Sequence, residues 1–329
     1  MIIENLAQIC SGHLLKEPLV KAVTSFTCKS DKVTNGGAFF AVHGTEEEIK
    51  EALDNGAYAI VHEQNIQTDD NEIAWIKVDS IEKAMIRFMR FLVETNDMNA
   101  ICLSVLQFDM LNSFKLQFKS VLLSGDVSEA FLSLISLEPT SYIFSKNKEF
   151  LEQISPQFES MDEHAQAAVL QSHSIFKTTF VCAESYFRDF MISSLFVPDF
   201  AAIVDFLKKK SLEFKIDSMD KNGHFEPIFI NTALEARPFG STHQAVIIET
   251  DERLFEKENE WIKNYVSDDY LLVLAPHNAK ISIPCKRYTS AKSLQAINIS
   301  ALRYILVLGN KDEITAALEE PKRVQGTLF

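Results

Sequence analysis

Residues with side chains that could support acid–base chemistry gather in one stretch of the chain, residues 223–251. This stretch contains His224, Glu226, Glu235, Arg237 and His243. Histidine and carboxylate side chains can exchange protons near neutral pH, and arginine can hold an anion. No nucleophile pattern such as G-x-S-x-G and no metal-ligand spacing accompanies them. We therefore treat His224, Arg237 and His243 as a candidate polar cluster, favour a surface loop with helix-capping groups, and assign no catalytic residue.

The cysteines give no sign of a metal centre or a disulfide framework. They are odd in number, widely spaced, and lack both a C-x-x-C pair and a histidine at ligand spacing: Cys10, Cys28, Cys102, Cys182 and Cys285. Small apolar side chains of this kind are usually buried in a reduced state. We expect free, mostly buried thiols and no bound metal.

Length and charge limit the class of protein. A chain of 329 residues exceeds one ordinary domain, and its 25 phenylalanines supply ample core. A net charge of −14 disfavours direct contact with a phosphate backbone, so we expect no nucleic-acid partner. No apolar run is long enough to cross a membrane, and Glu4 stands where a signal peptide carries basic residues. These features predict a cytoplasmic protein without a membrane partner.

The elements that would position any site are clearest in residues 32–63, which predict a strand, a helix and a second strand. The apolar run Phe39–His43 follows the turn residues Asn35-Gly36-Gly37. Thr45, with Glu48 three residues later, forms a capping box, so a helix should begin at Glu46. Gly56 should end this helix, because glycine takes a left-handed conformation without steric cost. A second apolar run, Tyr58–Val61, then predicts a buried parallel pair of strands.

This stretch resembles the N-terminal domain of the Mur ligases, the amide ligases of peptidoglycan synthesis, and is nearest the branch that adds D-alanyl-D-alanine. The resemblance rests on KSDKVTNGGAFFAVHG and ALDNGAYAIV. It implies an α/β fold with mostly parallel sheets and three domains. These are an N-terminal domain over residues 1–96, a shortened central domain over 97–239 and a Rossmann-like C-terminal domain over 240–329.

The remaining patterns predict an alternation of strands and helices. After Ser80, apolar residues at helical spacing predict a helix over Ile81–Thr95. Further predicted strands are Ala74–Asp79, Ala100–Val105, Ser141–Ser145, Ala245–Thr250 and the apolar runs YLLVLA and ALRYILVLGN. Ser174–Ala183 and Tyr186–Ser193 should form an antiparallel pair. Further predicted helices are Glu149–Ile154, Asp199–Lys210, Leu254–Val266 and Lys311–Glu319.

The resemblance also shows where the nucleotide site should be and how the chain departs from it. Mur ligases place the phosphate-binding loop G-x-x-G-K-T-T after the strand that corresponds to Ala100–Val105. This chain has Leu106, Gln107, Phe108, Asp109 and Met110 there. Without glycine the backbone amides cannot close around phosphates, and Asp109 would repel them. We therefore expect no ATP cofactor, and a helix or tight turn over Leu106–Leu111.

The residues that bind nucleotide in the family are also replaced in a second segment of this chain. In residues 223–241, His224 replaces an arginine, Asn231-Thr232 replaces an acidic pair, and Arg237-Pro238 replaces Asn-Pro. The resemblance thus implies a retained scaffold with altered ligand positions.

A retained substrate site is the other implication of the resemblance. Ser30 matches the serine of a D-S-R turn that contacts the uridine-nucleotide end of the family's substrate. We predict that Ser30, with Lys29, Lys32, Gly36 and Gly37, binds the diphosphate of a UDP-sugar-peptide precursor. The serine should then lie in an open cleft beside unpaired amides of Gly36 and Gly37. The alternative is an ordinary turn serine.

The C-terminal sequence QGTLF resembles the short tail by which bacterial DNA-processing proteins dock on the sliding clamp, through Gln325, Leu328 and Phe329. A frayed chain end is the alternative. Three functions remain open. The first is a Mur-ligase-like protein that has lost ligation and binds a precursor or a cell-wall enzyme. The second is an active ligase with a rebuilt nucleotide site, and the third is an adaptor that docks through its tail.

Overall fold

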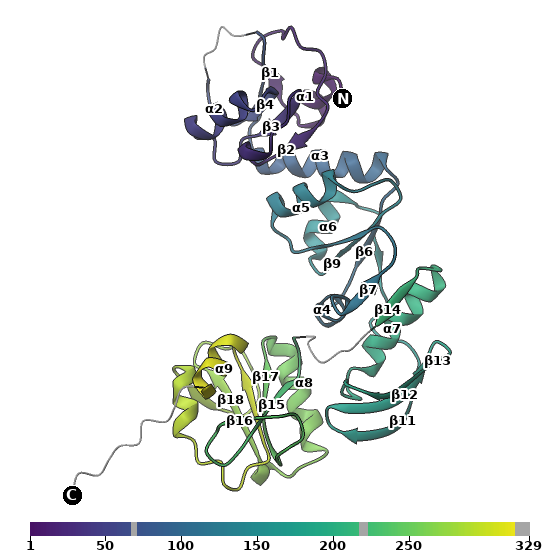
Figure 1. Cartoon of the computed structure of the whole chain (residues 1–329), viewed down its shortest axis with the longest axis vertical. Helices are drawn as coiled ribbons and strands as arrows, with labels where there is room; N and C mark the ends of the chain where they lie inside the picture. The colour runs from purple at the N-terminus through teal and green to yellow at the C-terminus, as the bar shows by residue number, and fades with distance from the viewer. Residues whose placement is uncertain (67–70, 217–222, 320–329) are drawn as a thin grey trace, which may run out of the picture. The chain divides into compact units, whose positions relative to one another are not determined.

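The computed structural model describes residues 1–66, 71–216 and 223–319, and they form two compact units (Figure 1). The first unit comprises Met1–Phe108 and Leu116–Met161. The second comprises Asp109–Lys115 and the residues from Asp162 onward. No helix in the described residues is long and apolar enough to span a membrane.

The first sheet of the first unit confirms the predicted strand-helix-strand arrangement. Its order is β1-β5-β4-β3-β2, and every pair except β1 with β5 is parallel. The strands are β1 (His13–Leu14), β2 (Phe26–Thr27), β3 (Gly37–Phe40), β4 (Ala57–His62) and β5 (Ala74–Lys77). Alternate residues face opposite sides, so Phe39 joins the core under α2 (Glu46–Asp54) and Phe40 joins the core under α3 (Ile81–Thr95). A 3₁₀ turn (Ser30–Lys32) precedes β3.

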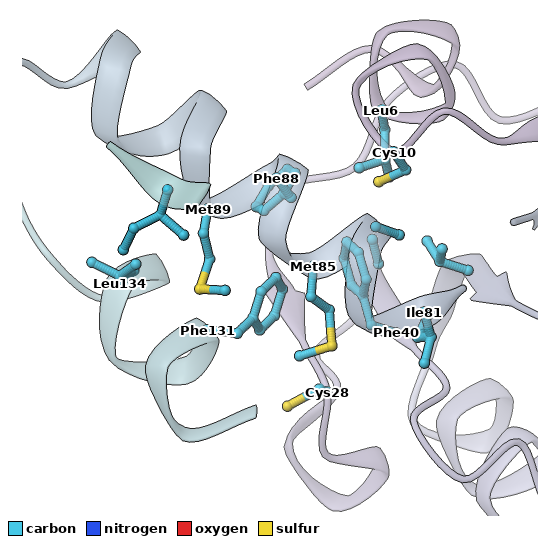
Figure 2. Close-up of a cluster of buried hydrophobic side chains, with 14 of the residues drawn as sticks. Leu6, Cys10, Cys28, Phe40, Ile81, Met85, Phe88, Met89, Phe131 and Leu134 are labelled. Atoms are coloured by element: carbon cyan, nitrogen blue, oxygen red, sulfur yellow. The ribbon is translucent and has the colours of Figure 1, made fainter. Parts of the chain in front are cut away.

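The second sheet of the first unit is fully parallel and shares its core with the first. Its order is β10-β6-β9-β8, from β10 (Glu159–Ser160), β6 (Asn99–Cys102), β9 (Tyr142–Ser145) and β8 (Ser120–Leu123). Helix α3 contributes Met85 and Phe88 to one hydrophobic cluster, which also contains side chains of α1 (Ile3–Ile9), α5 (Val127–Ile135) and α6 (Lys148–Ile154) (Figure 2). Phe88 lies 5.6 Å from Phe40 and 5.8 Å from Phe131 between ring centroids.

The second unit contains a small antiparallel sheet and a larger mixed sheet. The small sheet has the order β11-β12-β13, from β11 (Ala167–Ser174), β12 (Lys177–Cys182) and β13 (Ser185–Phe190), and packs on α7 (Val197–Lys209). A two-stranded sheet joins β7 (Phe114–Leu116) to β14 (Phe214–Ile216). The predicted antiparallel pair is confirmed as β12 and β13.

The larger sheet has the order β16-β15-β17-β20-β18-β19, and it is parallel from β17 to β19. Its strands are β15 (Glu226–Ile230), β16 (Ala236–Arg237), β17 (Gln244–Glu249), β18 (Leu271–Pro276), β19 (Lys286–Tyr288) and β20 (Tyr304–Leu308). Helices α8 (Glu252–Lys263) and α9 (Lys311–Glu319) accompany it, with short 3₁₀ turns at Asp268–Tyr270 and Ala291–Ala296. Strand β15 belongs to this sheet, so the sheet begins before residue 240, where the sequence predicts the start of the C-terminal domain. The division into three domains stays a prediction.

Most predicted elements are confirmed, and strand β11 is an exception with a clear physical cause. The mixed α/β architecture with mostly parallel sheets is confirmed, as are the helices at Ile81–Thr95 and Lys311–Glu319. Strand β11 was not predicted. Residues 168–174 are all exposed, so β11 shows no alternation between buried and exposed positions.

Candidate functional site

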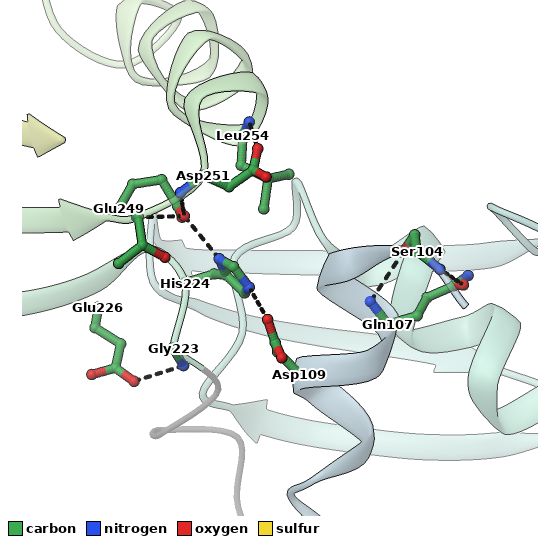
Figure 3. A network of polar contacts seen from close by, with 10 residues as sticks. Ser104, Gln107, Asp109, Gly223, His224, Glu226, Glu249, Asp251 and Leu254 are labelled. Atoms are coloured by element: carbon green, nitrogen blue, oxygen red, sulfur yellow. Dashed lines mark hydrogen bonds and ion pairs between the residues drawn. The ribbon is translucent and has the colours of Figure 1, made fainter. Parts of the chain in front are cut away.

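Helix α4 (Val105–Leu111) occupies the segment where the resemblance places the phosphate-binding loop, which confirms the expected helix. The backbone N–H of Ser104 donates to Gln107 Oε1 at 3.1 Å, and the N–H of Gln107 donates to Ser104 Oγ at 3.1 Å (Figure 3). This reciprocal pair is a capping box. The Phe108 N–H donates to the Ser104 carbonyl. The amides of Ser104, Gln107 and Phe108 are therefore used within the chain.

His224 lies between two carboxylates in the interior of the second unit (Figure 3). Its Nε2 is 3.1 Å from Asp109 Oδ2, at the end of α4, and its Nδ1 is 2.9 Å from Glu249 Oε1, at the end of β17. The His224 side chain is 2% exposed. Burial alone would lower the pKa of His224, but the hydrogen bonds and charges of Asp109 and Glu249 outweigh it and raise this pKa to about 9. At neutral pH the imidazolium thus donates to both carboxylates.

Glu249 is the centre of this network. Its Oε1 also accepts the backbone N–H of Thr250 at 2.7 Å and that of Asp251 at 2.8 Å. Burial opposes ionisation of Glu249, yet His224 and these donors hold its pKa below the ordinary value. Asp251 in turn accepts from the N–H groups of Arg253 and Leu254 and caps α8. The network therefore connects the start of α8 to the segment that contains Asp109.

Glu258, on α8, is a buried carboxyl close to Glu249. Its side chain is fully buried, and burial together with the nearby Glu249 carboxylate raises its pKa well above the ordinary range. Burial therefore favours the neutral form of Glu258. Sequence reasoning missed it, although a signal exists: Phe255, Glu258 and Ile262 follow the spacing of a buried helical stripe.

This arrangement does not suit acid–base catalysis near pH 7. A general base needs a nitrogen that is free of its proton and able to reach substrate. The raised pKa keeps His224 protonated, and both of its N–H groups are directed at internal carboxylates. The network instead connects Asp109, His224 and the end of β17 within the second unit.

The other two members of the candidate polar cluster lie elsewhere. Arg237, on the exposed strand β16, forms an ion pair with Glu235. His243 is exposed in the turn before β17. Among the contacts of the described residues, none joins His224 to Arg237 or His243.

A small aromatic cavity adjoins His224. Its volume is about 100 Å³, and Phe176, Phe196, Phe225 and Phe239 line it together with Met191 and Pro227. Phe225 adopts a left-handed backbone conformation with φ of 52°, which costs a bulky residue about 1–3 kcal/mol. Its ring packs 5.4 Å from that of Phe176. The rings fill most of the space, so only a small apolar group would fit.

Ser30, the predicted substrate residue, is half-buried and already has partners. Its hydroxyl donates to Glu51 Oε2 at 2.5 Å, and its carbonyl accepts from the Asn55 side chain at 3.0 Å. Lys29 and Lys32 are exposed, and Lys32 lies 3.6 Å from the Asp31 carboxylate. Ser30 therefore fastens its 3₁₀ turn to α2.

The amides of the neighbouring glycines are also paired. The Gly36 N–H donates to the Gly56 carbonyl at 2.9 Å, and the Gly37 N–H donates to the Thr34 carbonyl at 2.8 Å. Both glycines are buried. The expectation of unpaired amides at this turn is therefore wrong, because the turn closes its own hydrogen bonds and those of the α2 C-terminus.

Ser30 does border an open surface groove along α2, with a volume of about 860 Å³. The residues that line it include four carboxylates and one lysine: Glu47, Glu48, Glu51, Asp54 and Lys50. Carboxylates at this density repel a diphosphate. The groove thus has the wrong charge for the phosphates of a UDP-linked precursor.

The remaining sequence predictions concern the cysteines and the C-terminal tail. The five cysteines are free; Cys10, Cys28 and Cys182 are buried, and burial raises the pKa of Cys10 to about 12. Within the described ranges no three side chains of His, Cys, Asp or Glu converge as metal ligands would. Gln325, Leu328 and Phe329 lie outside the described residues, so docking through the tail stays a prediction.

Among known proteins, solved structures show the fold of this chain. No protein-family model matches the chain, and no curated protein matches it by sequence. A crystal structure of MurF from Acinetobacter baumannii is similar to it with 10% identity and a TM-score of 0.55, covering 96% of this chain and 97% of that chain. MurF ligase from Thermotoga maritima in complex with ADP is similar with 11% identity and a TM-score of 0.55, covering 91% and 98%. The chain therefore has a Mur ligase-like fold.

Proposed function

We propose that this chain is a cytoplasmic binding protein on the Mur ligase-like fold, that it does not carry out ATP-dependent amide ligation, and that its partner is a cell-wall enzyme. The observation that carries the loss of ligation is the capping box at the start of α4. Ser104 and Gln107 use amides that a phosphate-binding loop would direct at nucleotide. Asp109 adds a negative charge to the same short helix.

The polar network supports the same conclusion. A positive side chain in a nucleotide site must be able to turn toward phosphate. The charge of His224 is compensated by Asp109 and Glu249, and its side chain is 2% exposed. Freeing it would leave the buried Glu249 and the partly buried Asp109 without their counter-charge, which costs several kcal/mol. His224 therefore acts as a structural cation.

We propose a protein partner and not an anionic precursor because of the residues around Ser30. The groove beside Ser30 is acidic, the Ser30 hydroxyl donates to Glu51, and the nearby glycine amides are paired internally. A UDP-linked precursor would need positive charge and open donors at its diphosphate. The resemblance supplies the expectation that the partner belongs to peptidoglycan synthesis.

Isothermal titration with magnesium and ATP tests the loss of nucleotide binding. We expect no binding heat at millimolar ATP. MurF ligase from Thermotoga maritima, whose structure contains ADP, is the positive control under the same conditions. Sub-millimolar, magnesium-dependent binding by the present chain would overturn the proposal and favour an active ligase with a rebuilt site.

A thermal-shift titration with UDP-N-acetylmuramoyl peptide separates the two classes of partner, because a ligand bound only by the native state raises the melting temperature. We expect no shift for the wild type. A shift that Ser30→Ala abolishes and Ser25→Ala leaves intact would instead establish precursor binding. Ser25 is a matched control because its hydroxyl contacts Thr34 and not Glu51.

Sedimentation of a mixture of this protein and a candidate partner tests the proposed protein partner. The purified D-alanyl-D-alanine-adding ligase of the same organism should form a complex that sediments faster than either protein alone. Independent sedimentation of this ligase and of the other Mur enzymes would contradict this part of the proposal.

A further inference from the structure

The outer edge of β11 differs from every other sheet edge in the described ranges. The strand has eight residues, Ala167–Ser174, and comes first in the order β11-β12-β13. The other edge strands have four residues or fewer, except β13, which carries the charged residues Arg188 and Asp189. Short length, charged side chains and bulges are the usual means by which proteins prevent edge-to-edge pairing. The β11 edge is neither short nor charged, and its register shifts all lie after Val169.

The composition of β11 favours pairing with another strand. Its sequence AAVLQSHS contains no proline and no Asp, Glu, Lys or Arg. Residues 168–174 are exposed, and the large apolar side chains of Val169 and Leu170 are 46% and 59% exposed. An uncharged edge of this length offers backbone N–H and C=O groups to a partner at low desolvation cost.

Two rows of side chains cross the sheet and end on β11. One row runs from Tyr186 through Val181 to Ala168. The second runs from Phe187 through Phe180 to Val169, where the two phenylalanine rings stack at 4.9 Å. Cross-strand neighbours of this kind stabilise sheets by apolar contact. Both rows would continue onto a further strand that carries apolar side chains on both faces.

We propose that β11 pairs antiparallel with β11 of a second copy of this chain. Antiparallel pairing of identical segments is two-fold symmetric, so one contact satisfies both copies and closes the assembly as a dimer. The AAVL segment of the second copy would supply the apolar side chains that continue the two cross-strand rows. The chain has a net charge of −14, so two copies repel each other least where their facing surfaces carry no acidic side chains. The β11 edge is such a surface.

Two irregularities in β11 define which part of the edge takes part. The register with β12 shifts between Val169 and Gln171 and again between Ser172 and Ser174. Bulges twist an edge and disturb its pairing. His173 also has partners within the same sheet, with Nε2 2.9 Å from Asp189 Oδ1 on β13. The regular residues Ala167–Val169, together with the exposed bulge residue Leu170, therefore form the contact.

Sedimentation velocity over a range of protein concentrations tests this proposal. We expect wild type to shift from the monomer to twice the monomer mass as concentration rises into the tens of micromolar, the regime of a small interface. Leu170→Lys should remain monomeric throughout that range. Leu170 is exposed, so this variant should keep the wild-type melting temperature.

Leu19→Lys is the matched control, because Leu19 is 65% exposed and lies in the first unit. It should dimerise as the wild type does. A wild type that stays monomeric at every concentration, or a dimer that Leu170→Lys leaves intact, would overturn the proposal. Dimerisation through β11 is independent of nucleotide binding, so the two proposals can fail separately.

Discussion

The N-terminus of α2 and the His224 network both fix the start of a helix, but they use partners at very different distances along the chain. At α2, Thr45 Oγ1 accepts from the Glu48 N–H at 3.2 Å, and Glu48 Oε2 accepts from the Gly44 N–H at 3.0 Å. These partners are three and four residues apart. In the network, Glu249 and Asp109 lie 25 and 115 residues from His224.

The two regions also differ in exposure, and this difference sets how much each contact contributes. The α2 cap is exposed, so water can replace a lost hydrogen bond. The network is buried, so each charge depends on the presence of the others. Local caps should therefore contribute modest, separable amounts, whereas the network should act as one unit.

Removing His224 should have the largest effect. His224→Gln removes the positive charge and leaves the buried Glu249 and the partly buried Asp109 without a counter-charge. We expect the second unit to lose about 3–5 kcal/mol of unfolding free energy. Urea unfolding followed by Trp261 fluorescence measures this loss. Trp261 is in the second unit and Trp75, the other tryptophan, is in the first, so a Trp75→Phe background isolates the signal.

His243→Gln is the control for that measurement. His243 is exposed, so its replacement should change the free energy by less than about 0.5 kcal/mol. Equal effects of the two substitutions would show that His224 is no more than an ordinary surface residue.

The pH dependence of the second unit should follow the raised pKa of His224. A group with a folded-state pKa above its unfolded value of about 6.5 contributes stability that is complete below pH 6.5. This contribution is lost as the pH rises through about 9. Between pH 7 and pH 9.5 the second unit should therefore lose stability, up to about 3 kcal/mol. In His224→Gln the urea midpoint should vary much less over the same interval, and an equal slope in both proteins would rule out His224 as the cause.

Glu258→Gln should stabilise the second unit, in contrast to His224→Gln. The raised pKa of Glu258 favours folding at low pH, and this advantage is lost as the pH rises above its unfolded value of about 4.5. A neutral amide avoids that loss and can donate to Glu249. We expect a gain of about 1–2 kcal/mol at pH 7 and a smaller gain at pH 5. Glu260→Gln, on the exposed side of α8, should change little, and a destabilised Glu258→Gln protein would contradict the assignment of a neutral carboxyl.

The same contrast explains what the sequence could reveal. Thr45, Glu48 and Gly56 predict α2 and its ends, because each residue acts on backbone within one helical turn. Asp109 was recognised as unsuited to a phosphate loop, but its partner 115 residues away could not be found from spacing. Ser30 matches the family's motif, yet its actual partner, Glu51, depends on how α2 packs against the preceding turn. The fold was thus largely predictable from local patterns, whereas the buried site required contacts across the chain.

The cap of α2 should show the smallest effect and completes the comparison. Thr45→Ala removes the side chain that accepts from the Glu48 N–H, and the exposed helix end can use water instead. We expect a loss of about 1 kcal/mol in the first unit, followed by Trp75 fluorescence in a Trp261→Phe background. Glu47→Ala is the control, because Glu47 is exposed in the same turn. Thr45 and Glu48 are three residues apart in the first unit, and the His224 network lies in the second. In the double variant Thr45→Ala/His224→Gln the losses of unfolding free energy should therefore be the sum of those in the single variants. A different sum would mean that the α2 cap and the His224 network are energetically coupled.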